Sequence, residues 1–239
     1  MKTLKRQFVI IDNNWLRLKL TESILNEANG KTNKKQILLE NDEIKISFRS
    51  TDIANLFLKI ITHTQENYFY TIIDVLHDME NWEFKYIRSV NPTYDSHLKD
   101  RFTDLDLLEK HIMLYEHTEN VIDEAIELTK DLEFGIKSIV IFLALIHDFG
   151  KADKVSNVVA FKQGERHDVL SAKYMRLKLK QNMETDSIEK DHIIALYNIL
   201  SNHHSKEGRE INYIANIFYQ ADINARKKEV KKAKEKEGL

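Results

Sequence analysis

The spacing of hydrophobic and polar positions changes about fifty residues into the chain. Residues 44–48 alternate between apolar and polar side chains, which is typical of a half-buried strand, and residues 8–11 form a short apolar run rich in β-branched residues. Residues 37–39 are apolar and are separated from the alternating run by the polar segment 40–43. This part of the chain therefore predicts a small β-hairpin and a further strand-like run.

From residue 52 onward, apolar residues recur at the spacing of an α-helix. Asp52 is suited to cap the first of these helices. The pattern predicts helices over residues 52–61, 66–80, 104–132, 135–149, 167–181, 187–204 and 210–232, with one break in the third. We therefore expect a mainly α protein with a small α+β region at its N-terminus.

The polar stretch from Ser89 to Asp100 contains the only proline of the chain, Pro92, and is the best candidate for a domain boundary. We therefore predict an N-terminal α+β region over residues 1–100 and a helical domain over residues 101–239. The role of the N-terminal region is open. Its hairpin offers a strand edge through which a protein partner or a second copy of the chain could bind.

The last predicted helix ends in a net-basic run from Arg226 to Lys236. A solvated, frayed helix end is the simpler interpretation of this run. Contact with nucleic acid is the alternative, although glutamates within the run dilute the positive field that phosphate binding needs.

Composition narrows the functional classes. Apolar residues make up 42% of the 239 residues, enough for a substantial core, and one proline with six glycines leaves few helix breakers. The net charge of −2 gives no general attraction to polyanions. The absence of cysteine excludes disulfides, zinc–thiolate sites and cysteine nucleophiles, so any metal would need His, Asp and Glu ligands.

No apolar run approaches ~20 residues, and the basic N-terminus is not followed by the apolar region and cleavage site of a signal peptide. We therefore expect a cytoplasmic protein without a membrane partner.

The most informative feature is an apolar run, residues 139–146, that ends in His147 and Asp148. An imidazole and a carboxylate at the edge of a core cost desolvation energy unless a positive group lies between them, and a metal ion meets that need. Lys151 comes four residues after His147, so on a continuing helix it would share the same face. There it could neutralise a phosphate oxygen or position a nucleophile.

Further ligand-type residues are spread over about a hundred positions around this pair. They are His117, His167, His203, His204 and Asp222. Together with His147 and Asp148 they offer more donors than one ion needs, whereas two ions sharing a bridging carboxylate would use them all. The donor types suit Mn, Fe, Ni, Co or Zn, and Mg is an alternative. Two ions about 3.5–4 Å apart can acidify a bridging water and clamp a phosphate.

The order of these residues resembles the HD superfamily of metal-dependent phosphohydrolases over roughly residues 105–230: a lone His, then His-Asp, His, His-His and Asp. The resemblance implies an HD-domain helical bundle and an enzyme in which Asp148 bridges two metal ions. It further implies one ion bound by His117, His147 and Asp222, and a second ion bound by His167, His203 and His204.

Two details favour one branch of that superfamily. The segments 147–151 (His-Asp-Phe-Gly-Lys) and 166–172 (Arg-His-Asp-Val-Leu-Ser-Ala) are similar to the HD nucleases of type I CRISPR systems and to HD domains of conjugative relaxases. Those proteins act on nucleic acid, typically single-stranded DNA. Segment 205–210 lacks the Gly-Tyr-Pro motif of the HD-GYP branch, and segment 150–153 departs from the deoxynucleotide triphosphohydrolases.

The function expected from this resemblance is hydrolysis of a phosphodiester, with a nuclease on single-stranded nucleic acid as the favoured activity. Two alternatives stay open. The substrate could be a nucleotide or a cyclic nucleotide, or the chain could be an HD scaffold or binding module that has lost catalysis.

A second His-Asp pair, His77 and Asp78, also follows an apolar run, but no Gly-Lys comes after it. We interpret this pair as an ordinary helix end. The other histidines outside the proposed set are also interpreted as structural. They are His63, His97, His111 and His192.

Overall fold

The structure is a computed structural model that describes residues 5–12, 18–24, 38–40, 43–90, 105–205 and 212–239. Its contacts divide the chain into two compact units, Met1–Lys59 and Ile60–Leu239, and each unit is described by itself. The boundary predicted near residue 100 lies outside the described residues, as does His97.

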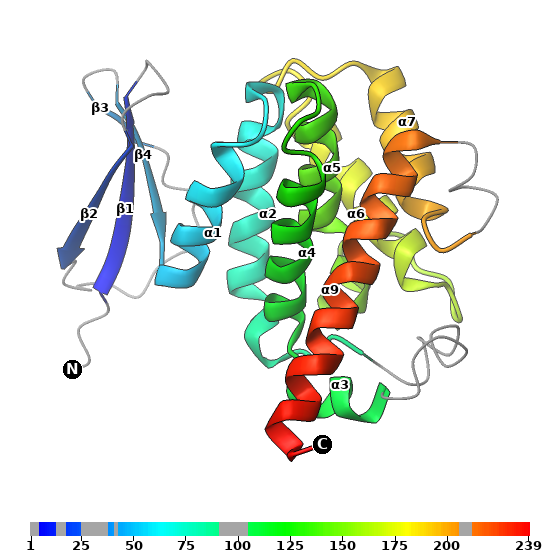
Figure 1. Cartoon of the computed structure of the whole chain (residues 1–239). Helices are drawn as coiled ribbons and strands as arrows, with labels where there is room; N and C mark the ends of the chain where they lie inside the picture. The colour runs from blue at the N-terminus through cyan, green and yellow to red at the C-terminus, as the bar shows by residue number, and fades with distance from the viewer. Residues whose placement is uncertain (1–4, 13–17, 25–37, 41–42, 91–104, 206–211) are drawn as a thin grey trace. The chain divides into compact units, whose positions relative to one another are not determined.

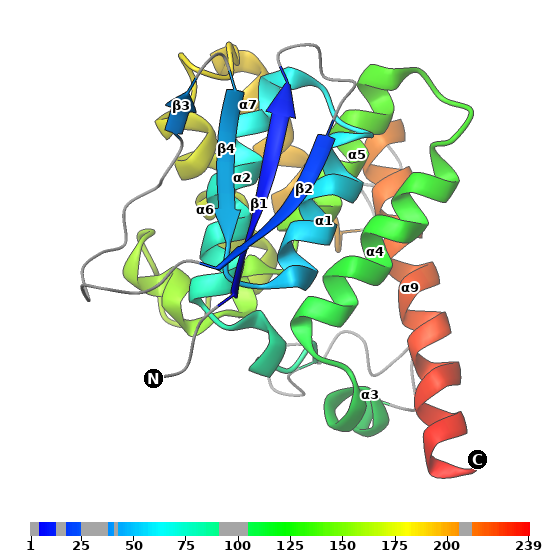
Figure 2. The same cartoon turned by 90° about the vertical axis from the view of Figure 1, so that its left-hand side faces the viewer.

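The first unit contains a four-stranded antiparallel sheet in the order β2-β1-β4-β3 (Figure 2). Its strands are β1 (Lys5–Asp12), β2 (Leu18–Ile24), β3 (Leu38–Glu40) and β4 (Glu43–Phe48). The predicted hairpin is confirmed, with Leu39 opposite Ile44. Sequence reasoning missed β2, because Glu22 interrupts its apolar alternation and glutamate has low strand propensity.

Helices make up most of the described chain, which confirms the mainly α fold. They are α1 (Thr51–Ile61), α2 (Phe69–Asn81), α3 (Leu105–His111), α4 (Leu114–Leu128), α5 (Phe134–Ile146), α6 (His167–Gln181), α7 (Lys190–Ser201) and α9 (Tyr213–Glu237). The predicted break in the third helical segment is the gap between α3 and α4.

Helix α5 forms the centre of the second unit. Every residue from Val140 to Ile146 is buried, as expected for a helix that is apolar on all sides. Helices α4 and α9 both pack against it and run alongside each other (Figure 1). Among the described helices, none combines the length and apolar character needed to cross a membrane. The C-terminal end of α5 therefore delivers the following residues, His147 and Asp148, into the interior of the bundle.

Helix α5 ends at Ile146, so the expectation that it continues to residue 149 is wrong. The His147 ring donates from Nδ1 to the Ala144 carbonyl at 2.8 Å, an acceptor that a continuing helix would use for the backbone N–H of Asp148. The chain then forms a short 3-10 helix, η4 (Phe149–Lys151).

A buried carboxylate far along the chain caps helix α2. Both oxygens of Asp186 are used: Oδ1 accepts from the backbone N–H of Tyr70, and Oδ2 accepts from the backbone N–H and the hydroxyl of Thr71, at 2.9, 2.9 and 2.6 Å. First-turn N–H groups have no partner inside their own helix, so this side chain satisfies donors that would otherwise be buried unpaired. The contact ties the segment between α6 and α7 to α2.

We expect Asp186→Ala to lower the free energy of unfolding by about 1–2 kcal/mol, because it removes this cap. Denaturant unfolding followed by circular dichroism measures the change. The control is Glu184→Ala, which alters an exposed acid of the same segment. Equal midpoints for the two variants would show that the cap contributes nothing.

Candidate metal centre

The residues proposed as ligands come from five separate places in the second unit. His117 lies on α4, His147 and Asp148 follow α5, and His167 is the first residue of α6. His203 and His204 follow α7, and Asp222 lies on α9. The structure brings all seven into one cluster, whose members are linked by the distances given below.

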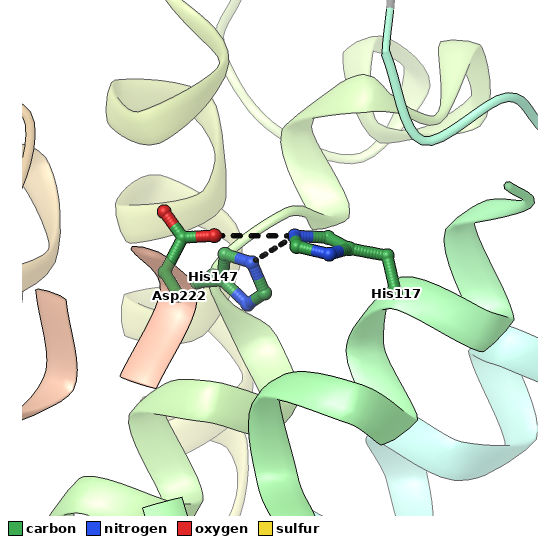
Figure 3. A group of neighbouring side chains, drawn as sticks. All are labelled: His117, His147 and Asp222. Atoms are coloured by element: carbon green, nitrogen blue, oxygen red, sulfur yellow. Dashed lines mark hydrogen bonds and ion pairs between the residues drawn. The ribbon is translucent and has the colours of Figure 1, made fainter. Parts of the chain in front are cut away.

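His117 is the hub of the first half of the cluster (Figure 3). Its Nε2 lies 3.3 Å from His147 Nε2, 3.3 Å from Asp222 Oδ1 and 3.4 Å from Asp148 Oδ2. Two ligand atoms bound at about 2.0–2.1 Å to one tetrahedral ion lie about 3.3 Å apart. The separations around His117 therefore match the edges of a metal coordination shell.

The second half of the cluster lies around His167 and His204. The Nε2 atoms of these rings are 3.1 Å apart, and His167 Nε2 lies 3.5 Å from Asp148 Oδ1. His203, His204 and Asp222 also offer three ligand atoms within 4.8 Å of one another. The two oxygens of Asp148 thus face different histidines, and Asp222 contributes to both halves.

Three of the rings have their second nitrogen fixed by a hydrogen-bond acceptor. His147 and His203 donate from Nδ1 to the carbonyls of Ala144 and Leu200, at 2.8 and 2.7 Å. His117 donates from Nδ1 to Glu229 Oε1 at 2.9 Å. Because these acceptors require a proton on Nδ1, the Nε2 atom of each neutral ring presents a lone pair. This arrangement is the usual one for histidines that bind metals.

Asp148 is a buried carboxylate in a strongly positive setting. Lys151 Nζ lies 2.9 Å and Arg226 Nη2 lies 3.7 Å from its Oδ2. Burial alone would raise the pKa of Asp148, but Lys151 and the surrounding histidines hold that pKa well below its usual range. These contacts of Oδ2 are ion pairs, and the oxygen makes no hydrogen bond of regular geometry among the described residues. An ionised, buried carboxylate of this kind is a suitable ligand for a cation.

The net charge of the cluster also favours a cation. Asp148, Asp222 and Glu229 are three buried carboxylates, whereas Lys151 and Arg226 are the two cations that contact this group. The group therefore holds one more carboxylate than cationic side chains, and a metal ion or, without one, a proton on His117 supplies the balancing charge. Burying an unbalanced carboxylate is costly unless a positive charge compensates it.

The two histidines of the first half differ in basicity. Burial lowers the pKa of His147 to about 4, so this ring is neutral at pH 7. Burial and Arg226 also act to lower the pKa of His117, but Glu229 and Asp222 outweigh them and raise it. His117 is therefore the ring of this pair that would hold a proton when no metal competes for Nε2.

Sequence reasoning missed Arg226 and Glu229. The expectation that the chain from Arg226 onward is solvated and frayed is wrong for these two residues, which are 2% and 1% exposed on a helix that continues to Glu237. Their spacing was the available signal: positions four and seven residues after Asp222 share its helix face. The remainder of the run is partly neutralised, because Lys228 and Lys232 pair with Glu124 and Glu116 of α4.

Lys151 occupies a different position from the one expected. It lies on η4 and not on a continuing helix, and its Nζ donates to the Ser89 carbonyl at 2.8 Å as well as contacting Asp148. Its side chain is only 7% exposed. The structure thus places Lys151 as a partner of Asp148.

The second His-Asp pair lies within helix α2, close to its C-terminal end. Asp78 accepts a hydrogen bond from the Tyr174 hydroxyl at 2.7 Å and pairs with Lys178 at 2.5 Å. His111 contacts Glu237 at 2.5 Å, and His192 hydrogen bonds to Tyr68. These contacts account for the residues without a metal.

Comparison with known proteins identified no relative: no family model matches the chain, and neither do curated proteins or solved structures. The case for a metal centre therefore depends on the donor atoms, their separations and their charges.

A glycine holds η4 against the first residue of α6. A Cβ added to Gly150 would lie 2.0 Å from the backbone oxygen of His167, and the Gly150 N–H donates to Ser171 Oγ at 2.8 Å. Neither the backbone of α6 nor that of η4 can yield without moving a proposed ligand. Only glycine fits this contact.

We expect Gly150→Ala to lower the free energy of unfolding by about 1–3 kcal/mol, because the backbone must shift to admit the methyl group. Thermal and denaturant unfolding measure the effect. Gly135→Ala is the matched control on α5, where the nearest atom to the added Cβ is 3.5 Å away. The control should be neutral or stabilising by up to about 1 kcal/mol. Comparable losses in both variants would contradict the proposed contact.

Proposed function

We propose that this protein is a metal-dependent phosphohydrolase that hydrolyses phosphodiesters at a centre of two divalent ions, with single-stranded nucleic acid as the favoured substrate. The observation that carries the proposal is the position of Asp148. Its Oδ2 faces His117 and His147 within 3.5 Å, and its Oδ1 faces His167 at 3.5 Å. A carboxylate with one oxygen toward each of two histidine groups is suited to bridge two ions.

The donor set supports the choice of ions. His117, His147 and Asp222 would hold one ion, and His167, His203 and His204 would hold the other, with Asp148 shared. Asp222 could also contribute to the second position, because it lies within 4.8 Å of His203 and His204. Imidazole and carboxylate ligands suit Mn, Fe, Co, Ni or Zn. Such ions supply an acidified water and polarise phosphate oxygens.

The side chains around the donors keep Asp148 ready to bind. Lys151 holds it ionised, and Lys151 and Arg226 both contact its Oδ2. Glu229 and two backbone carbonyls keep three rings in the tautomer that offers Nε2. In this account Lys151 acts through Asp148 and is a positioning residue.

The choice of substrate rests on the resemblance to HD nucleases, carried by segments 147–151 and 166–172. An inactive scaffold is disfavoured on physical grounds, because a scaffold has no need to gather seven donors, most of them buried, around one carboxylate. The order of ligand residues along the chain adds support for the hydrolase class.

We expect the purified protein to bind two divalent ions per chain and Asp148→Asn to lose both the metal and the activity, because the amide is a poor bridging ligand. Elemental analysis gives the metal content, and hydrolysis of bis-(p-nitrophenyl) phosphate with added Mn²⁺ gives the activity. Asp78→Asn is the control, since it alters the second His-Asp pair. Wild-type protein that binds no divalent ion would refute the proposed function.

A substrate panel tests the nuclease branch. We expect the Mn²⁺-loaded protein to cleave a labelled single-stranded oligonucleotide faster than a duplex, and to turn over nucleotides and cyclic dinucleotides poorly. Gel analysis and chromatography measure the products. An intact oligonucleotide beside rapid turnover of a nucleotide would replace the nuclease by a nucleotide phosphodiesterase.

A further inference from the structure

Glu229 is buried beside the first half of the metal centre but contributes no proposed ligand. It is 1% exposed on α9. Its Oε1 accepts hydrogen bonds from His117 Nδ1 and Asn120 Nδ2, both at 2.9 Å, and its Oε2 accepts from Arg226 Nη1 at 3.1 Å. A side chain held by three donors has one orientation.

We infer that Glu229, locked by Arg226, is a positioning residue that sets the affinity of the ion bound by His117, an inference that rests on the proposed function. His147 and His203 donate to neutral carbonyls, whereas His117 donates to a carboxylate. A carboxylate partner increases the electron density that an imidazole offers to a metal and fixes the ring orientation. Among these three rings, His117 is therefore the strongest donor.

Arg226 connects this contact to the rest of the centre. Its Nη1 donates to Ser89 Oγ at 2.9 Å and its Nη2 donates to the Ser89 carbonyl at 3.0 Å. The guanidinium also lies 3.7 Å from Asp148 Oδ2. Its hydrogen bond to Glu229 prevents that side chain from turning away from His117. The same guanidinium lies beside the proposed bridging carboxylate.

A purely structural role is the competing explanation. Buried ion pairs also occur where no ligand binds, and they are weak evidence of any one role. The Arg226–Glu229 pair alone therefore does not imply a link to metal binding. The two explanations differ in what they predict for the neutral variant Glu229→Gln. A structural role changes unfolding alone, whereas a positioning role weakens the binding of one ion and leaves the other nearly unchanged.

The experiment titrates the metal-free full chain with Co²⁺, following visible absorption and competition with a chelator, and counts bound ions by elemental analysis. We expect two ions on the wild type, and on Glu229→Gln one affinity reduced about 10- to 100-fold with the other nearly unchanged. Glu124→Gln is the matched control: Glu124 is a buried carboxylate of the same α4–α9 pair that binds Lys228 and contacts no proposed ligand.

A second variant covers the case in which Glu229→Gln fails to fold. Asn120 is partly exposed and hydrogen bonds to Glu229, so Asn120→Ala loosens the carboxylate without touching a proposed ligand. We expect it to weaken the same ion by about two- to tenfold. Affinities equal to those of Glu124→Gln in the folded variants would overturn the inference and leave the two-ion function standing. A wild type that binds no Co²⁺ would overturn both.

Discussion

The arrangement of this protein depends on one buried carboxylate, Asp148. It follows α5, whose residues from Val140 to Ile146 are all apolar and buried, and is 3% exposed. An ionised group in that place is stable only if positive or donor groups surround it. Five elements bring such groups toward Asp148 or its neighbours. They are the helices α4, α6 and α9, the end of α7 and the short helix η4. The need to compensate this charge therefore explains why distant segments converge at the end of α5.

Helix α9 supplies three side chains to the proposed metal centre and its surroundings. Asp222, Arg226 and Glu229 lie on one face at intervals of four and three residues, so each successive turn adds a group. Asp222 reaches His117 and the α7 histidines, Arg226 reaches Asp148 and Ser89, and Glu229 reaches the far side of the His117 ring. A rigid helix keeps these three groups in register.

Much of the helical part could be predicted from the sequence, and for a definite reason. Helix α6 spans the residues predicted, 167–181, a stretch without glycine or proline that follows the loop containing Gly164. The residues expected near Asp148 do cluster, and their order along the chain was the signal that identified them.

The missed features depend on contacts that local pattern does not contain. Arg226 and Glu229 lie in a stretch of alternating charges, and only the packing of α9 against α4 and α5 shows which of those charges are buried. Lys151 reaches Asp148 from η4 because the His147 ring and the tight approach of Gly150 to His167 turn the chain after α5.

The same packing bears on substrate class. The centre has one more carboxylate than cationic side chains, and two divalent ions bound there would make it strongly positive. Under the proposed function, a centre of that sign would attract an anionic phosphodiester and would give a neutral ester no such advantage.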